Sequence, residues 1–440
     1  MNQIKPLLTN LPKRGYLAVG LLLRLFLAPF LSHPFDMRVF MAVGAAVARG
    51  ITPYGQYVLQ DIFAGTPHPH LYGTMLGIGY PPPWGLITGL MYSFSSAVAP
   101  NNLYVYVLAL KIPIILAELA TAVLVYNILK TRIGDKVASK AFLLFLFSPF
   151  IIVVGTVWGM FDILALFFAL LSAYGLHRDW RLSSLLLSVA SVLKLFPLML
   201  APLYSVLLYK SSRSLKVAFQ FFLFTVALTG LFTITPMIAF GWPISNLYNA
   251  LVYHISTTNP MYYSQTAFPY GAASPLNTFT FLNNLAGETL QLPWVFFYLW
   301  IPACIAVYVL LLRKRMCNTG FVSTVQWSLL LLLTLFTTRV WVSEQNLTFL
   351  FAFLALSVFL QNPKDLGTIH HSWMLLFSFV MVHVPVIAFF WLPYPWTLDA
   401  ASSCADGSLG WTRLLLMALL TISWLALSWH YVARKLRWRS

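Results

Sequence analysis

Long apolar segments recur along the whole chain, and they restrict its fold more than any other feature of the sequence. Hydrophobic residues make up 60% of the 440 positions and charged residues only 9%, whereas soluble proteins carry about 25% charged residues. So few charged groups cannot cover a surface that faces water, which argues against a cytosolic enzyme, a secreted disulfide-rich domain and a nucleic-acid-binding domain. The sequence therefore predicts an all-α integral membrane protein with a single polytopic domain over residues 1–440.

Most of the positive charge lies in short loops between the apolar segments. The net charge is +16, and the basic loops fall at 5–14, 130–140, 178–181, 210–216, 313–315, 364 and 434–439. The positive-inside rule places such loops in the cytoplasm. We therefore expect both termini to be cytoplasmic, and no nucleic-acid partner is needed to explain the charge.

With the basic loops inside, the sequence accommodates about twelve transmembrane helices. The predicted spans are 16–31, 103–129, 141–157, 159–177, 183–194, 197–209, 217–239, 291–312, 321–338, 345–360, 373–391 and 411–432. The spans at 183–194 and 197–209 are too short to cross a ~30 Å hydrocarbon core twice without help. We expect two short helices that meet at 194–197, inside protein or beside a cavity. The competing interpretation is one kinked span over 183–209, which would reverse the topology of everything after it.

Three long segments then lie outside: a first outer loop at 32–102, a second at 240–290 and a shorter one at 392–410. The apolar stretch 84–99 within the first loop looks like a span. If it crossed the membrane, the basic loop 130–140 would be on the wrong side. We therefore expect 84–99 to be an interfacial or re-entrant helix at the outer leaflet.

Ionisable residues are predicted at one level near the outer leaflet. They are Asp36, Asp162, Glu344, Lys111, Lys194 and Arg339. Such a residue near hydrocarbon costs a few kcal/mol unless it is paired or hydrated, so the layer predicts a polar cavity that opens outward.

Each of these residues also has a purely structural interpretation. Asp36 could cap the helix that begins near it, Asp162 could pair with a buried base, and Lys194 could extend to the interface. Glu118, near mid-membrane, is expected to pair with a neighbouring polar group. No glycine-rich phosphate loop, serine-nucleophile motif or zinc signature is present.

The order of motifs resembles the GT-C superfamily of integral-membrane glycosyltransferases. The motifs are SHPFD at 32–36, GITPY at 50–54, YPPPW at 80–84, WGMFD at 158–162, LKLFP at 193–197 and SEQN at 343–346. The later motifs look most like the branch that holds the first mannosyltransferase of the GPI-anchor pathway and related prokaryotic enzymes. The resemblance covers most of the chain.

The resemblance implies transfer of a hexose, with mannose favoured, from a polyprenyl-phosphate carrier such as dolichol phosphate to a lipid, glycan or protein acceptor. Asp36 is the position that matches the catalytic base. Many relatives have a second acid two places on, where this chain has Arg38. We therefore expect no metal cofactor, although a divalent metal is the alternative.

The remaining roles follow from what this chemistry requires. Lys194 and Arg339 are the candidates to hold the carrier phosphate, because partly desolvated cations stabilise anionic charge strongly. Glu344, Asp162 and Tyr54 would orient the sugar or the acceptor, or position those cations. One carboxylate suffices for inversion. We expect the site to face outward across a membrane, with the plasma membrane of a prokaryote favoured.

Two other functions fit the same sequence. A lipid or sugar transporter or flippase would also use charged residues at mid-height and broken helices. A non-catalytic scaffold for glycan assembly is the third alternative, because a single aspartate can be vestigial. Nothing in the sequence identifies the acceptor or the carrier length.

Overall fold

The protein is almost entirely helical, as the sequence predicts. A computed structural model describes residues 12, 14–63, 71, 73–255, 295–314, 320–340, 342–406 and 408–435. Most of the predicted second outer loop, residues 256–290, lies outside the described residues. The strands in the described part form one antiparallel pair, β1 Gln56–Val58 with β2 Thr74–Leu76.

Six helical segments of the described chain are long and apolar enough to cross a membrane. They are α6 Leu103–Lys130, the run Asp135–Trp158, α12 Leu215–Ala239, α18 Phe321–Thr338, the run Glu344–Gln361 and the part Leu415–Arg434 of α22 Ser408–Lys435. The run Asp135–Trp158 consists of α7 Asp135–Phe147, α8 Pro149–Ile152 and the π-helix η1 Val153–Trp158. The run Glu344–Gln361 consists of the 3₁₀ turn η4 Glu344–Asn346 and α19 Leu347–Gln361. The chain is thus a multi-pass membrane protein, and these six account for half of the twelve predicted spans.

Shorter or less apolar helices lie at the other predicted spans. They are α2 Arg14–Leu27, α9 Asp162–Gly175, α10 Trp180–Leu193, α11 Leu200–Ser212, α16 Val295–Tyr298, α17 Trp300–Arg313 and α20 Leu366–His383. Polar side chains cap the first turn of several helices in the protein. The Asp179 carboxylate accepts hydrogen bonds from the first backbone N–H groups of α10, and Asn102 does the same for α6, which satisfies donors that have no partner within the helix.

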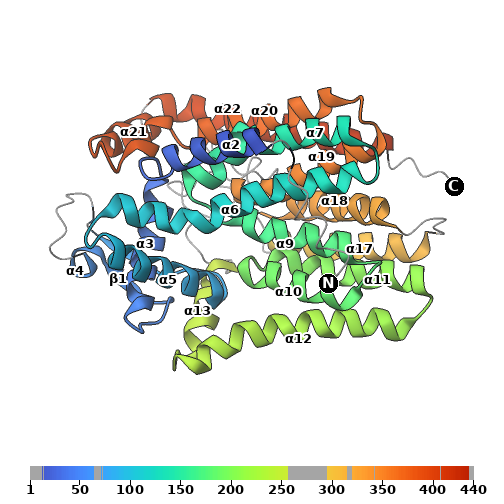
Figure 1. Ribbon diagram of the computed structural model, residues 1–440, viewed down its shortest axis with the longest axis horizontal. Coiled ribbons are helices and arrows are strands. Elements are labelled where there is room, and N and C mark those ends of the chain that lie inside the picture. Colours follow the sequence, from blue (N-terminus) through green and yellow to red (C-terminus); the bar gives the residue numbers. More distant parts are fainter. Residues whose placement is uncertain are drawn as a thin grey trace.

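The basic loops that the structure describes lie at one end of the molecule. Figure 1 shows the turn from α6 to α7 and the turn from α11 to α12 at the same end. Arg132 lies over the Phe321 ring, and His177 shares a 3.0 Å hydrogen bond with Thr324. Lys210 donates to two carbonyls at the end of α17. These contacts join the loops before α7, α10, α12 and α18 into one surface, which we call the basic end.

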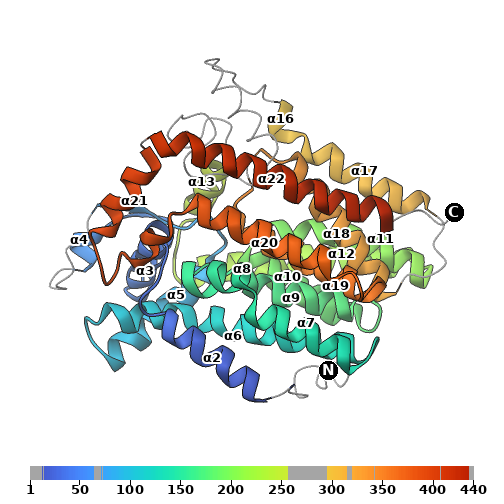
Figure 2. The ribbon, with the colours of Figure 1, turned by 90° about the horizontal axis from the view of Figure 1, so that it is seen from above.

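The predicted first outer loop forms the opposite end. It contains α3 Pro34–Ala48, β1, α4 Leu59–Ile62, β2 and α5 Pro82–Val98. Helix α5 covers the apolar stretch 84–99 and packs against α3. Figures 1 and 2 both place α3, α4, α5 and α21 Thr397–Asp406 at this end. The indole of Trp242, just after α12, donates to the Gly50 carbonyl and so ties α12 and the following α13 Ile244–Ile255 to it.

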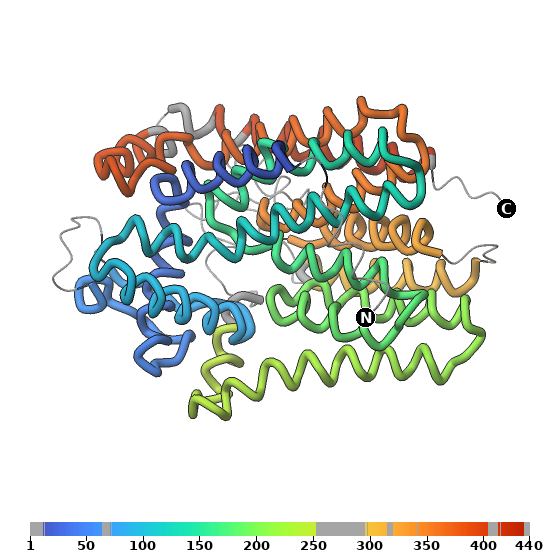
Figure 3. The backbone as a smooth tube through the Cα atoms, in the orientation of Figure 1, coloured from blue at the N-terminus to red at the C-terminus, as the bar shows by residue number. Residues whose placement is uncertain are grey.

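The chain reverses direction between α10 and α11. Helix α10 ends at Leu193, and the 3₁₀ turn η2 Phe196–Met199 leads into α11. The start of α10 and the end of α11 both contact the basic end, so the two helices are a hairpin with its apex at 194–196 (Figure 3). The expected pair of short helices is therefore present.

Burial differs sharply between the helices. The window of 18 residues that contains α19 is 89% buried, whereas the corresponding window of α12 is 22% buried. Exposed apolar side chains such as Leu215 and Phe219 are stable in contact with lipid tails, because hydrocarbon imposes no hydrophobic penalty. Helix α19 therefore forms the centre of the bundle, and α12 is positioned along its outside.

Candidate active site

Asp36 lies in the first turn of α3, next to the residue that caps this helix. His33 is the N-cap, Pro34 follows it, and the Asp36 backbone nitrogen lies 3.3 Å from His33 Nδ1. The Asp36 Oδ2 atom lies 3.1 Å from His33 Nδ1 and accepts a 2.7 Å hydrogen bond from Trp158 Nε1. The Asp36 side chain is 23% exposed. The carboxylate is therefore held in place and still accessible.

The surroundings keep this carboxylate ionised. Burial by itself raises the pKa of Asp36, but His33, the Trp158 hydrogen bond and the charge of Lys194 act against burial and together hold the pKa below its ordinary value of 3.8. A negative charge is also favoured in the first turn of a helix. Asp36 is thus a charged acceptor at neutral pH, and it lies within electrostatic range of Lys194.

The segment WGMFD at 158–162 connects two parts of the site. Trp158 ends the π-helix η1, and Asp162 begins α9. Between them Gly159 has a φ of 96°, a left-handed conformation, and a Cβ there would lie 2.5 Å from the Met37 side chain. Only glycine meets both conditions. This turn directs Trp158 toward Asp36 and Asp162 toward Lys194.

Asp162 and Lys194 form a buried ion pair. Lys194 Nζ lies 3.1 Å from Asp162 Oδ2, and the two side chains are 5% and 0% exposed. The ammonium group also lies over two aromatic rings, 4.2 Å from the Tyr80 centroid and 4.6 Å from the Phe161 centroid. Asp162 is fully buried, and Lys194 is the ion-pair partner that the described residues provide for it. The structural interpretation of Asp162 as the partner of a buried base is confirmed, and Lys194 does not extend to the interface.

Tyr54 supports this pair from the first outer loop. Its hydroxyl donates a 3.0 Å hydrogen bond to the Tyr80 carbonyl oxygen, and the Tyr80 ring in turn faces Lys194. The motifs GITPY and YPPPW are therefore adjacent in space. Tyr54 is therefore linked to Lys194 through Tyr80.

Glu344 forms a second buried contact near Trp158. Its Oε1 atom lies 2.9 Å from His383 Nδ1, with the two side chains 5% and 7% exposed. The His383 ring centroid is 6.1 Å from that of Trp158. Arg339 is the half-buried residue that caps the end of α18, five positions before Glu344. Its assignment to the site stays a prediction, made from its expected depth and from the need for a cation beside the carrier phosphate.

Sequence reasoning assigned no role to the residues that hold these groups, although three of them lie in the motifs quoted above. His33 stacks on Trp158 with ring centroids 4.3 Å apart, and neither residue was assigned a role. His383 and Tyr80 were missed in the same way. The order His-Pro before an acid is a signal for a helix N-cap, so His33 was accessible to sequence reasoning. Trp158 was not, because 122 positions separate it from Asp36.

Other buried charges are structural. Glu118 accepts a 2.5 Å hydrogen bond from Arg24 and one of 3.1 Å from Thr156, which agrees with the expected polar partner. Lys111 donates to backbone carbonyl oxygens of Ala28, Leu31 and Val157. These contacts join α2, α6 and the run Asp135–Trp158. Glu118 is thus enclosed by its partners, whereas Asp36 is partly exposed.

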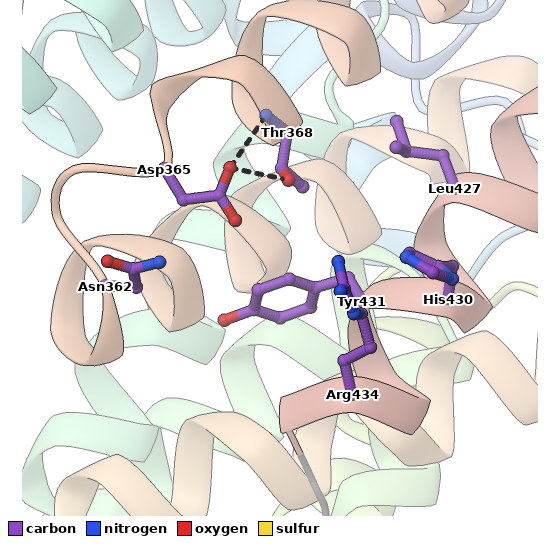
Figure 4. Close-up of a pocket in the computed structure, with 7 residues that line it drawn as sticks. All are labelled: Asn362, Asp365, Thr368, Leu427, His430, Tyr431 and Arg434. Atoms are coloured by element: carbon purple, nitrogen blue, oxygen red, sulfur yellow. Dashed lines mark hydrogen bonds between the residues drawn. The ribbon is translucent and has the colours of Figure 1, made fainter.

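A cavity of about 370 Å³ lies elsewhere, between α20 and the end of α22. Figure 4 shows Asp365, Tyr431 and Arg434 around it. The Asp365 carboxylate accepts hydrogen bonds from the backbone and hydroxyl of Thr368, so it serves to cap α20. None of the predicted site residues lines this cavity.

No group of three or more His, Cys, Asp or Glu side chains that could hold a metal is found in the part of the chain that the structure describes. His68 and His70 lie outside that part. A comparison of the chain with models of known protein families finds no match. A comparison with curated proteins likewise finds no similar relative.

Proposed function

We propose that this protein is an inverting membrane glycosyltransferase that moves a hexose, with mannose favoured, from a polyprenyl-phosphate carrier to a hydroxyl group on the outer face of a membrane. The observation that carries the proposal is the Asp36 carboxylate, which is ionised, partly exposed and fixed by Trp158 and His33 next to the buried Asp162–Lys194 pair. A positioned carboxylate beside a cation suits proton removal from an acceptor and stabilisation of a departing phosphate.

The proposed step is a single displacement. The acceptor oxygen bonds to the anomeric carbon, the bond from that carbon to the carrier phosphate breaks, and the acceptor proton passes to Asp36. Both contacts to this carboxylate that the described residues provide go to Oδ2, which leaves Oδ1 for the proton. Lys194 and Arg339 would stabilise the phosphate as it leaves, and Asp162 and Tyr54 would hold Lys194 in position. Glu344 would position Trp158 through His383.

The proposed topology has twelve spans, cytoplasmic termini and the site on the outside, and a prokaryotic plasma membrane is the favoured location. The gathering of the basic loops at one end and of Asp36 at the other supports this arrangement. A probe at Ser93→Cys and one at Lys136→Cys, each in a background with the three native cysteines replaced, should react from opposite faces of intact cells. Reaction of both from the same face would refute the topology.

The activity test uses reconstituted vesicles with radiolabelled mannosyl- and glucosyl-phosphate polyprenols. Asp36→Asn should abolish transfer, because the amide cannot accept the acceptor proton. Asp399→Asn is the matched control, since Asp399 is an exposed acid in α21 at the same end of the molecule. Normal transfer by the Asp36 variant would exclude this residue as the base.

The hairpin of α10 and α11 supports a second candidate, a transporter or flippase, because chain reversals near mid-membrane line transport sites in other folds. The same vesicles separate the two functions. A transporter would move the labelled carrier lipid across the bilayer without forming a glycoside.

A further inference from the structure

A second polar site lies at the basic end, on the opposite side of the molecule from Asp36. It is a cavity of about 230 Å³ at the junction of the α6–α7 turn, the α9–α10 turn and the start of α18. Arg132, Arg178, His177, Tyr174 and Phe321 line it. None of the described residues that line it is acidic.

The two arginines are oriented rather than free in solvent. The Arg178 guanidinium lies 4.0 Å from the centroid of the Tyr174 ring, and that of Arg132 lies 4.8 Å from the centroid of the Phe321 ring. Stacking on an aromatic face fixes the plane of a guanidinium group while its N–H groups remain available to donate. Two such groups beside one cavity form a pair of preset hydrogen-bond donors.

The cavity holds positive charge without an internal counterion. Burial lowers the pKa of Arg132 below its ordinary value, and the nearby charge of Arg178 lowers it further, against an opposing effect of Tyr174. The next acid along the chain, Asp179, accepts hydrogen bonds from the start of α10. An anion in the cavity would relieve the repulsion between the two arginines.

We propose that this cavity binds a phosphate group, and that the phosphate belongs to the headgroup of an anionic lipid in the leaflet at the basic end. Arginine forks match phosphate oxygens in geometry and charge. Pockets for drug-sized ligands measure about 300–1,000 Å³, so the smaller volume fits a single headgroup. The cavity lies among the basic loops, and basic residues at the membrane surface attract the headgroups of anionic lipids.

The test is a binding measurement on the full-length purified protein, stripped of lipid in detergent. Phosphatidylglycerol and phosphatidylcholine are titrated and bound lipid is counted by native mass spectrometry, and glycerol 1-phosphate is titrated in a parallel arm. Arg132→Gln, Arg178→Gln and the double variant are compared with Arg181→Gln. Arg181 is the matched control because it belongs to the same basic loop and also lies over an aromatic ring, that of Trp180, but does not line the cavity.

We expect the double variant to lose phosphatidylglycerol affinity by about tenfold or more, since two charge-assisted hydrogen-bond donors are removed, and Arg181→Gln to change it less than about twofold. Each single variant retains one of the two arginines, so its affinity can be measured even if the double variant fails to fold. Equal affinity in wild type and double variant would overturn the proposal, and so would an equal loss in Arg181→Gln. Binding of glycerol 1-phosphate in preference to the lipid would overturn the assignment to a lipid headgroup.

Discussion

The buried pair of Lys194 and Asp162 should respond strongly to loss of its cation. In Lys194→Met the flexible apolar stem is kept, but the 3.1 Å ion pair and the two ring contacts are lost. Asp162 would then be a fully buried carboxylate without its ion-pair partner. Removal of one member of a buried ion pair costs about 3–5 kcal/mol, most of it from the charge left behind. We expect a loss of that size in the free energy of unfolding.

The assay is a double-mutant cycle of Lys194→Met and Asp162→Asn, measured by equilibrium unfolding of the purified protein in mixed micelles. The double variant should recover much of the loss, because it leaves no unpaired charge. Lys136→Met is the control, since Lys136 is exposed at the basic end and an exposed substitution changes stability by about 0.5 kcal/mol or less.

The same variants also separate stability from function. If Lys194 holds the carrier phosphate as proposed, the double variant should fold well and still fail to transfer sugar. A loss below about 1 kcal/mol in Lys194→Met, the value typical of an exposed pair, would refute the reasoning that this pair is desolvated.

Three further outcomes follow from other contacts. Gly155→Ala should destabilise the protein by about 1–3 kcal/mol through overpacking, because its Cβ would collide with the Glu118 Oε1 atom. Gly230 has open space around it, so Gly230→Ala should be neutral or stabilising. Equal unfolding curves for the two variants would contradict this account. Because the folded-state pKa of Asp36 lies below 3.8, its ionisation stabilises the fold above that pH and the contribution is lost as the pH falls through the folded value. The stability difference between wild type and Asp36→Asn should therefore be constant from about pH 7 to 5 and shrink below pH 3.8, and an unchanged difference at low pH would argue against this sign. Trp158→Phe removes the 2.7 Å hydrogen bond to Asp36, so the pKa of Asp36 should rise. The fall in transfer activity on the acid side of the pH profile should then occur at higher pH. An unchanged pH profile would show that the indole does not affect the pKa of this carboxylate.

The class of fold can be predicted from the sequence, because the number of apolar side chains in a segment decides whether the segment lies in water or in the membrane. Apolar runs of span length must enter hydrocarbon, and helices are the structure that satisfies their backbone groups there. Positive charge in a loop predicts on which side of the membrane the loop lies. The sequence therefore predicted that the basic loops lie together and that the predicted first outer loop lies at the opposite end. The short pair of helices around Lys194 was predicted for the same reason, since neither segment is long enough to span.

The details of the site required the tertiary structure. Asp36, Asp162, Lys194 and Tyr54 were selected from the sequence, but their partners were not. Periodicity and charge describe one segment at a time, whereas the Trp158 contact to Asp36 joins segments 122 positions apart.

The chain by itself determined that this protein is helical, enters a membrane and gathers its basic loops at one end, because each property depends on the local content of apolar and charged side chains. Tertiary packing decided which buried charges neutralise one another and which carboxylate stays reachable. Glu118 is enclosed with Arg24 and Asp162 with Lys194, while Asp36 keeps an exposed edge. The physical reason is that the pairing of a buried charge depends on which helices come into contact, and no single helix contains that information.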